Sequence, residues 1–179
     1  MGGEARARIV EQDYKQALKW FEKAAKLNHS DAQRNLAVMY AEGLGVKPDV
    51  AAAVTWFKRA AMRGNANAQR DLGVMYAEGR GVKPDDAAAV TWFEKAAMQG
   101  NAGAQRDLAV MYASGRGVEK DFVRAHMWSS LAAAQGERQA AENRDLIAKN
   151  MSPDMIAKAK EMARAWMADY EARRKRQGR

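Results

Sequence analysis

The chain has 179 residues, of which 47% are hydrophobic and 29% are charged, a composition typical of a folded globular protein and not of a disordered one. It contains no cysteine, which excludes disulfides, thiolate metal sites and cysteine nucleophiles. The formal net charge is +8, but residues 172–179 carry five basic and no acidic side chains, so the rest of the chain is only mildly basic.

The sequence shows neither a membrane span nor a secretory signal. No apolar run approaches the ~18 residues that a transmembrane helix needs, and the N-terminal MGGEARARIV lacks the apolar core of a signal peptide. We expect a soluble protein, placed in the periplasm or outside the cell if a signal has been removed from this sequence, and in the cytoplasm otherwise.

The segment 1–12 precedes the first regular unit of the chain. Val10 lies 36 residues before Val46, in register with the end of a unit that this sequence does not contain. We predict either that the segment is the remnant of a preceding repeat in a longer natural protein, or that the first helix is left bare. An exposed end of this kind favours self-association.

A 36-residue period organises the chain. Tryptophan, tyrosine and paired glycines recur at this interval, at Trp20, Trp56, Trp92 and Trp128, at Tyr40, Tyr76 and Tyr112, and at Gly43/Gly45, Gly79/Gly81 and Gly115/Gly117. Residues 49–84 and 85–120 agree at 27 of 36 positions, which indicates recent duplication, strong constraint or deliberate construction. Such a period predicts a stacked array, with repeats at 13–48, 49–84, 85–120 and 121–151.

Each repeat is predicted to begin with an amphipathic helix, which we call helix A. In the first repeat Ala17, Phe21 and Ala24 follow helical spacing, with Trp20 and Ala25 beside them. The helix is expected to end at a residue of positive φ. That residue is Asn28 in the first repeat and Gly64, Gly100 or Gly136 in the later ones.

A second amphipathic helix, helix B, is predicted after this turn. Asn65 and Asn101 are its predicted N-caps. Ala68, Leu72 and Tyr76 recur at helical spacing and form its inward face, up to about residue 78.

The segment YAEGLGVKPD at 40–49 contains a G-x-G motif that could bind a phosphate through its backbone. Similar segments recur at the 36-residue interval, YAEGRGVKPD at 76–85 and YASGRGVEKD at 112–121, which indicates a structural element and not a single binding site. A phosphate loop needs a preceding strand and, in its P-loop form, a lysine followed by serine or threonine. Neither is present. We interpret the motif as a helix-to-helix reversal in which Gly79 ends helix B, Gly81 takes a second unusual backbone angle, and Asp85 caps the next helix A.

Residues 152–171 are predicted to form a C-terminal capping helix, with Ser152 as N-cap and Pro153 at the first helical position. Its apolar seam is Ile156, Ala159, Ala163, Trp166 and Tyr170. We expect this seam to pack on helix B of the fourth repeat, with a second chain as the alternative.

The basic tail 172–179 is expected to be a disordered, solubilising end. Nucleic-acid binding is disfavoured because no aromatic residues interleave with its charges.

The stretches ALKWFEKAA and DAQRNLAVMYAEGLGV resemble the Sel-one-like repeat (SLR) family, relatives of the tetratricopeptide repeats with units of about this length. The resemblance covers residues 13 to about 171. Gly73 keeps a glycine that is usual in the family, whereas Ala37 and Ala109 replace it. The paired cysteines of a disulfide-rich branch once described as β-lactam-binding are missing, which argues against kinship with that branch. The resemblance implies an adaptor, often in the bacterial envelope or in host contact and signalling.

These features together predict an all-α protein. Its expected architecture is a right-handed α-α superhelix (solenoid) of four 36-residue two-helix repeats plus a C-terminal capping helix.

Few residues could carry catalysis. His29 lies in the first turn, where later repeats have asparagine, so a turn or cap role is favoured over a ligand role. His126 shares a column with Leu18, Val54 and Val90 and is expected to be a partly packed core residue. The two histidines cannot form an i, i+4 metal pair, and no H-E-x-x-H or G-x-S-x-G motif occurs. We therefore expect no enzyme activity, no cofactor and no metal site.

The tryptophan column is interpreted as core and not as a peptide-stacking surface, because truncating a packed tryptophan costs about 3 to 5 kcal/mol. Trp20 nevertheless lies at the edge of its apolar stripe. At this position part of each tryptophan ring in the column could border a groove. The methionine column, Met39, Met75 and Met111, is likewise interpreted as gap-filling core.

Equivalent positions in stacked repeats form ladders, and two ladders are cationic: Lys23, Arg59 and Lys95 on helix A, and Arg34, Arg70 and Arg106 on helix B. The alternative for each is a solvated face with neighbouring acids. Less regular columns of helix A are better candidates for partner contacts. The candidate partner-binding residues are Lys19, Lys23, Lys26, Thr55, Arg59, Met62, Thr91, Lys95 and Met98.

The sequence thus predicts a non-catalytic scaffold or adaptor that binds a protein or peptide, expected to be acidic, on a concave helix-A surface. Two alternatives remain open. One is a cell-wall or glycan-associated binding protein, and the other is an engineered repeat scaffold without a natural ligand.

Overall fold

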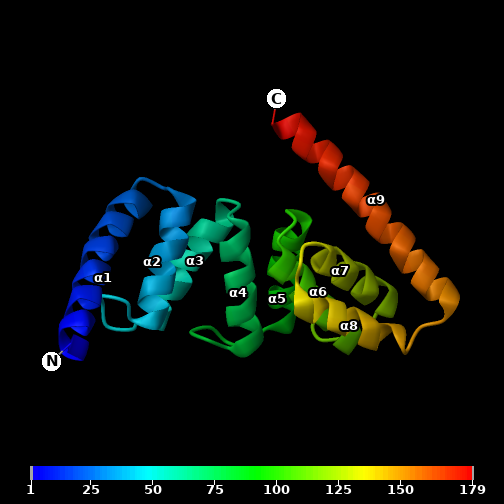
Figure 1. Cartoon of the computed structure of the whole chain (residues 1–179), viewed down its shortest axis with the longest axis horizontal. Coiled ribbons are helices and arrows are strands. Elements are labelled where there is room, and N and C mark those ends of the chain that lie inside the picture. Colours follow the sequence, from blue (N-terminus) through cyan, green and yellow to red (C-terminus); the bar gives the residue numbers. More distant parts are fainter. Residues whose placement is uncertain (1, 179) are drawn as a thin grey trace. The chain divides into compact units, whose positions relative to one another are not determined.

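In a computed structural model of the protein, the backbone is described for residues 2–178 and the side chains for residues 11–178. Every regular element in this part is an α-helix (Figure 1). The helices are α1 (Gly2–Lys26), α2 (Ser30–Glu42), α3 (Val50–Met62), α4 (Ala66–Glu78), α5 (Asp86–Met98), α6 (Ala102–Ser114), α7 (Phe122–Ala134), α8 (Arg138–Ala148) and α9 (Pro153–Gln177). The predicted all-α fold of two-helix repeats is confirmed. The side chain of Val10, on which the expectation of a preceding repeat depends, lies outside the described residues.

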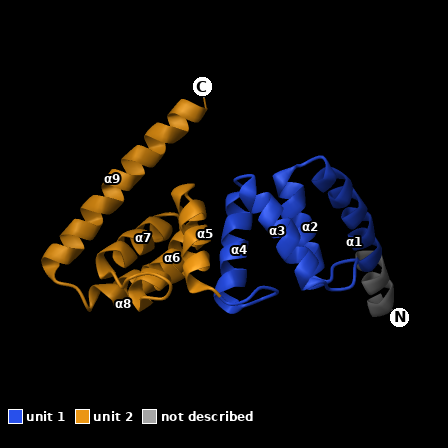
Figure 2. Ribbon diagram, turned by 180° about the vertical axis from the view of Figure 1, so that it is seen from behind, with its two compact units in different colours: residues 1–84 blue, residues 85–179 orange. Residues whose placement is uncertain are grey.

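The chain divides into two compact units, residues 1–84 and 85–179 (Figure 2). Unit 1 contains α1 to α4 and unit 2 contains α5 to α9. The A helices are α1, α3, α5 and α7, and the B helices are α2, α4, α6 and α8. The division falls at the border between the second and third predicted repeats.

The core of each repeat is built from alanine and leucine. In unit 1 the buried Ala25, Ala32 and Leu36 form a cluster on which Phe21 and Trp56 pack. The side chains of Leu36 and its two later equivalents, Leu72 and Leu108, are fully buried. Alanines between them allow the helices to approach closely, and truncating one of these leucines would cost about 2 to 5 kcal/mol.

Side-chain caps fix where the helices begin. Asp49, Asp85 and Asp121 each accept a hydrogen bond from a backbone N–H in the first turn of α3, α5 or α7. Asn65 and Asn101 do the same for α4 and α6, so these predicted caps are confirmed. Each such cap contributes about 1 kcal/mol.

The G-x-G motif is a chain reversal, as predicted. Gly79 ends α4 at φ 70°, and its N–H donates to the carbonyl of Met75. Gly81 has φ 69°, and a Cβ on it would lie 2.7 Å from Cγ1 of Val50. The second glycine is therefore required both by its backbone angle and by its close approach to helix A of the same repeat.

The capping helix α9 packs mainly against α7, the A helix of the fourth repeat, and not against the B helix α8 as predicted. Its predicted seam is half-buried to buried, and the rings of Trp166 and Trp128 lie edge to face. The reason is chemical: α8 buries only Ala140 and Ile147, whereas α7 offers a large indole to cover. The intramolecular seam is thus confirmed and its partner helix is corrected.

The basic tail is also different from expectation, because α9 continues to Gln177. Nε of Arg173 lies 2.9 Å from Oδ2 of Asp169, one helical turn earlier. The tail is thus helical up to Gln177 and not disordered.

No helix within residues 2–178 combines the length and the apolar character that crossing a membrane requires.

Candidate functional site

All nine predicted partner-binding residues are exposed at the surface of the A helices or at their C-terminal ends. They form two groups, Lys19, Lys23, Lys26, Thr55, Arg59 and Met62 in unit 1, and Thr91, Lys95 and Met98 in unit 2. The hydroxyls of Thr55 and Thr91 donate to carbonyls one turn back in their own helices. The threonines therefore offer mainly their methyl groups to a partner.

The helix-A cationic ladder stacks on the tryptophan column. Nζ of Lys23 lies 5.3 Å from the centre of the Trp20 ring, and Nζ of Lys95 lies 4.4 Å from that of Trp92. The guanidinium carbon of Arg59 lies 4.6 Å from the Trp56 ring. This pairing follows from the i, i+3 spacing on a helix, and each pair contributes about 0.5 to 1 kcal/mol. Every A helix of the first three repeats thus presents an indole with a cation held over it.

The core interpretation of the tryptophan column is confirmed for Trp128, correct in part for the half-buried Trp56 and Trp92, and wrong for Trp20. Trp128 is 7% exposed, whereas Trp20 is 64% exposed. Trp56 and Trp92 are half-buried. Trp166 of α9 lies edge to face on Trp128, whereas each of the other three indoles has a cation over its ring.

In unit 2 the end of the helix-A surface is occupied by α9. Nε1–H of Trp166 donates to Sδ of Met98 at 3.4 Å. Oη–H of Tyr170 donates to the carbonyl of Gln99 at 3.0 Å, and its ring lies over Gly100. Met98, one of the predicted partner-binding residues, is therefore in contact with the chain's own C-terminal helix.

In unit 1 the exposed Trp20 borders a shallow recess of about 500 Å³. It is lined by Gln12, Lys15, Gln16, Lys19, Trp20 and Lys23. Nζ of Lys15 is paired with Glu11 at 2.8 Å, but Lys19 and Lys23 leave the recess positively charged. The structure thus brings together Lys19, Lys23 and Trp20, of which the first two were predicted as partner-binding residues.

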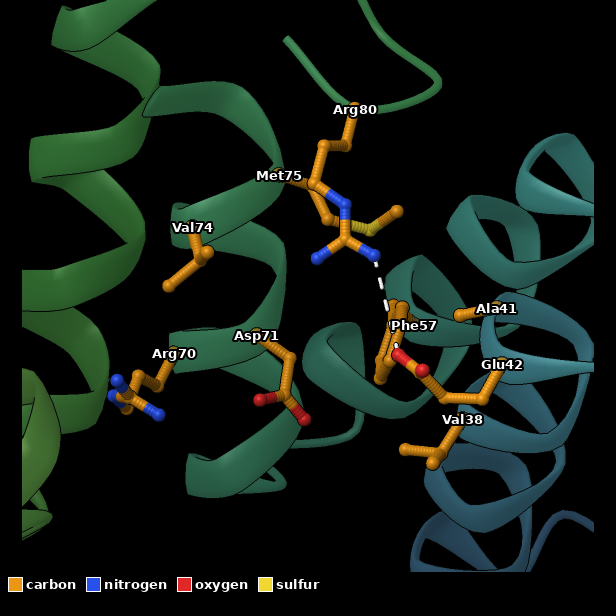
Figure 3. A pocket seen from close by; sticks show the side chains of 9 residues that line it. All are labelled: Val38, Ala41, Glu42, Phe57, Arg70, Asp71, Val74, Met75 and Arg80. Atoms are coloured by element: carbon orange, nitrogen blue, oxygen red, sulfur yellow. Dashed lines mark ion pairs between the residues drawn. The ribbon is translucent and has the colours of Figure 1, made fainter. Parts of the chain in front are cut away.

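A second recess of unit 1, between α2 and α4, was not predicted (Figure 3). It has a volume of about 190 Å³ and is lined by Val38, Ala41, Glu42, Phe57, Arg70, Asp71, Val74, Met75 and Arg80. Figure 3 shows Arg80 reaching across toward Glu42, with 4.0 Å between Nη2 and Oε1. Asp71 is held by Arg34 at 2.8 Å. The rim charges are therefore largely matched within the protein, above an apolar floor.

The arginine ladder on helix B also connects neighbouring repeats. Arg34 of α2 bonds Asp71 of α4, and Arg106 of α6 bonds both Asp107 and, at 3.4 Å, Glu137. This confirms acids beside the ladder, but Arg34 and Arg106 are half-buried and not fully solvated.

The histidines occupy the places expected of structural residues. His29 stands at the N-cap position of α2 without a side-chain cap bond. His126 is 3% exposed in α7, and burial, together with Arg144 and Lys160, lowers its pKa. Within the described residues, no group of three or more histidine, aspartate or glutamate side chains gathers where it could hold a metal ion.

Residues 3–29, 30–65, 66–101 and 102–137 match the family model of the Sel1 repeat. The last three stretches start at the first residues of α2, α4 and α6, half a period away from the repeat borders predicted above, which stay a prediction. No curated protein matches the chain.

Solved structures of bacterial proteins share the fold. A Sel1 repeat protein from Oxalobacter formigenes is 29% identical, with a TM-score of 0.67 over 77% of this chain and 59% of that one. The protective antigen c5321 of uropathogenic Escherichia coli, which displays an SLR fold, is 29% identical, with a TM-score of 0.66 over 86% of this chain and 41% of that one. Helicobacter pylori cysteine rich protein B has a TM-score of 0.60 at 22% identity, over 74% of this chain and 96% of that one, which shows the fold alone. The chain thus spans about half the length of the first two.

Proposed function

The chain belongs to the Sel1 repeat family, and we propose that it is a non-catalytic scaffold that binds a protein or peptide partner on its helix-A surface. Sel1 repeat proteins mediate protein–protein interaction. Our proposal assigns this interaction to the helix-A surface and to an acidic partner.

The observation that carries the proposal is the exposed Trp20 with Lys23 held over its ring. Folding alone does not account for an indole that is 64% exposed. Tryptophan and arginine are also the residues most enriched among those that dominate binding energy at protein interfaces. The repeated indole and cation pair offers an apolar surface and a positive charge in the same place, which suits a partner with carboxylates beside apolar side chains.

The charge of this surface supports an acidic partner. The recess beside Trp20 is lined by three lysines and two glutamines, and of its lysines Lys15 is paired with Glu11. Electrostatic attraction of this kind raises association rates and selects against basic competitors. Because the side chains stand on helices held by a packed core, binding would order few of them, which limits the entropic cost.

The proposal can be tested by replacing Lys23, Arg59 and Lys95 together with glutamate. Affinity capture from cells that produce the protein, followed by mass spectrometry, should identify an acidic partner that the wild-type chain retains and the triple variant loses. Circular dichroism should show unchanged helix content, because all three side chains are exposed. Equal capture by both proteins would remove this ladder from the binding surface.

A further inference from the structure

Unit 1 contains a third recess, where the α1–α2 turn meets the C-terminal end of α3. Its volume is about 390 Å³ and its lining is Asn28, Gln33, Arg59, Met62 and Arg63. We call it the Gln33 recess. Two arginines and no acid line it among the described residues.

Gln33 is only 1% exposed, and its two polar atoms are treated differently. Nε2 donates to the carbonyl of Ala25 at 3.1 Å. Oε1 is buried and has no hydrogen-bond partner among the described residues. A buried acceptor left without a donor is unfavourable, so a ligand that donates to this oxygen would gain affinity from it.

The same place in unit 2 shows how the oxygen is satisfied elsewhere. Gln105 stands 72 residues after Gln33 and also donates Nε2 to a helix-A carbonyl, that of Ala97. Its Oε1 accepts a hydrogen bond from Nε2 of Gln135 at 2.8 Å. The residue of unit 1 that corresponds to Gln135 is Arg63. The glutamine oxygen is thus paired by the protein itself in unit 2, and it has no donor among the described residues in unit 1.

The α5–α6 turn, which corresponds to the α1–α2 turn of unit 1, shows what kind of segment fits there, because α9 lies on it. Trp166 contacts Met98 and Trp128, and Tyr170 bonds Gln99 and covers Gly100. At the positions 72 residues before Gln99, Trp128 and Gly100, unit 1 has the exposed Leu27, the half-buried Trp56 and Asn28. Asn28 has φ 68°, so the α1–α2 turn contains a left-handed residue at the same place as the α5–α6 turn. The turn after helix A, together with the tryptophan beside it, therefore forms a surface on which an amphipathic helix can pack, and we call this surface the seat. In unit 2 the seat is occupied by α9.

The charges of the two seats differ. Unit 2 has Leu131 and Gln135 where unit 1 has Arg59 and Arg63, and the helix seated on unit 2 brings Arg173 and Arg174 beside Met98. Met98 corresponds to Lys26 in unit 1, so basic side chains at that point of a helix would be repelled by Lys26 and by the two arginines that line the recess. Carboxylates would form charge-assisted hydrogen bonds with them instead.

We propose that the Gln33 recess docks an acidic amphipathic helix of a partner protein. An aromatic side chain of that helix covers the α1–α2 turn as Tyr170 covers Gly100, a donor reaches Oε1 of Gln33, and carboxylates pair with Arg59 and Arg63. This inference rests on the proposed function and names the class of partner.

Two synthetic peptides test it by fluorescence anisotropy with the whole chain. The acidic probe has the 25-residue sequence of α9 with Arg173, Arg174, Lys175 and Arg176 replaced by glutamate, and the basic probe has the unchanged sequence. We expect the acidic probe to bind with an affinity that falls as salt is added, and the basic probe to bind far more weakly.

The decisive variant is Arg63→Gln, which places a glutamine where unit 2 already has Gln135. The introduced amide can donate to Oε1 of Gln33, as Gln135 donates to Gln105. The variant should therefore fold at least as well as the wild type while losing about 10-fold or more in affinity for the acidic probe. Arg138→Gln, at an exposed position of α8 in unit 2, is the matched control and should bind like the wild type.

Equal binding of the acidic probe by wild type and Arg63→Gln would overturn the inference, and so would no binding at all. Tighter binding of the basic probe would reject an acidic partner and assign the recess to a second copy of this chain. The proposed function fails separately, by unchanged partner capture after replacement of Lys23, Arg59 and Lys95. A partner lost by that triple variant but kept by Arg63→Gln would retain the scaffold and reject the recess.

Discussion

The indoles of Trp128 and Trp166 meet edge to face, with ring centroids 5.7 Å apart and planes inclined by 70°. This contact joins the A helix of the last repeat to the C-terminal helix. It shows that a tryptophan of this column can be covered by another helix, whereas Trp20 at the other end of the column is 64% exposed.

Trp166→Ala should loosen α9 from α7. Loss of the edge-to-face pair and of the covered apolar area should cost about 2 to 3 kcal/mol of unfolding free energy. Trp20→Ala is the matched control, since a ring that is 64% exposed contributes little to folding. Denaturant unfolding of both variants measures the difference, and similar losses would contradict the covering role of Trp166.

Gly100→Asn should weaken the seat of α9. Gly100 has φ 86°, a left-handed conformation of the kind that Asn28 adopts in the first repeat, so the backbone tolerates asparagine. A Cβ at this position, however, would lie 2.6 Å from Cζ of Tyr170. Gly136→Asn, at φ 91° with nothing within 4 Å of its Cβ, is the control. Limited proteolysis should release the C-terminal helix faster from Gly100→Asn, and equal rates for the two variants would count against the Tyr170 contact.

The second glycine of the G-x-G motif should be less replaceable in the third repeat than in the second. Gly81 and Gly117 have φ 69° and 67°, so alanine costs about 1 to 2 kcal/mol at either position. At Gly81 the nearest atom is the side-chain Cγ1 of Val50 at 2.7 Å, and the nearest backbone atom, the oxygen of Val50, lies at 3.1 Å. At Gly117 all three nearest atoms belong to the backbone of Asp86 and Ala87, and they can move only if the chain itself shifts. Thermal melts should therefore show a larger loss for Gly117→Ala, and the reverse order would refute this packing argument.

Acidification should destabilise unit 2 through His126. Its pKa is lowered below the ordinary 6.5, chiefly by burial and further by Arg144 of α8 and Lys160 of α9, with Asp145 opposing. The unfolded chain therefore takes up the proton at higher pH than the folded chain. Stability is full above about pH 6.5 and falls as the pH decreases through the interval between the two pKa values.

The control for this pH effect is His126→Leu, because Leu18 occupies the same column in the first repeat. The difference in melting temperature between about pH 7 and about pH 5.5 should be smaller in the variant than in the wild type. An identical difference would show that His126 does not couple to folding.

Much of the fold could be predicted from the period, because glycine, asparagine and aspartate at fixed offsets determine helix ends by local backbone chemistry. The Asn65 cap and the Gly81 turn follow from such rules and were found where expected. The position of α9 could not be predicted in this way. Its seam indicated an apolar partner, but the choice of α7 over α8 depends on which neighbouring surface leaves an indole uncovered.

The candidate site was predicted in part for the same reason. Exposure of Lys19, Lys23 and Arg59 follows from helical periodicity, whereas that of Trp20 depends on the absence of a covering helix among the described residues of its unit. The Gln33 recess had one sequence signal, the arginine at position 63 where the later repeats have Gln99 and Gln135. That signal acquires meaning only when the partner of Gln105 is known.

The seating of α9 on Met98 and Trp128 also bears on how such a chain can change in length. Copies of the 36-residue unit inserted ahead of Asp85 would leave both of these contacts intact, since every residue they require lies downstream. A copy placed after α8 would instead separate the closing helix from the indole it shields. The near-identical second and third repeats lie directly on either side of that insertion point.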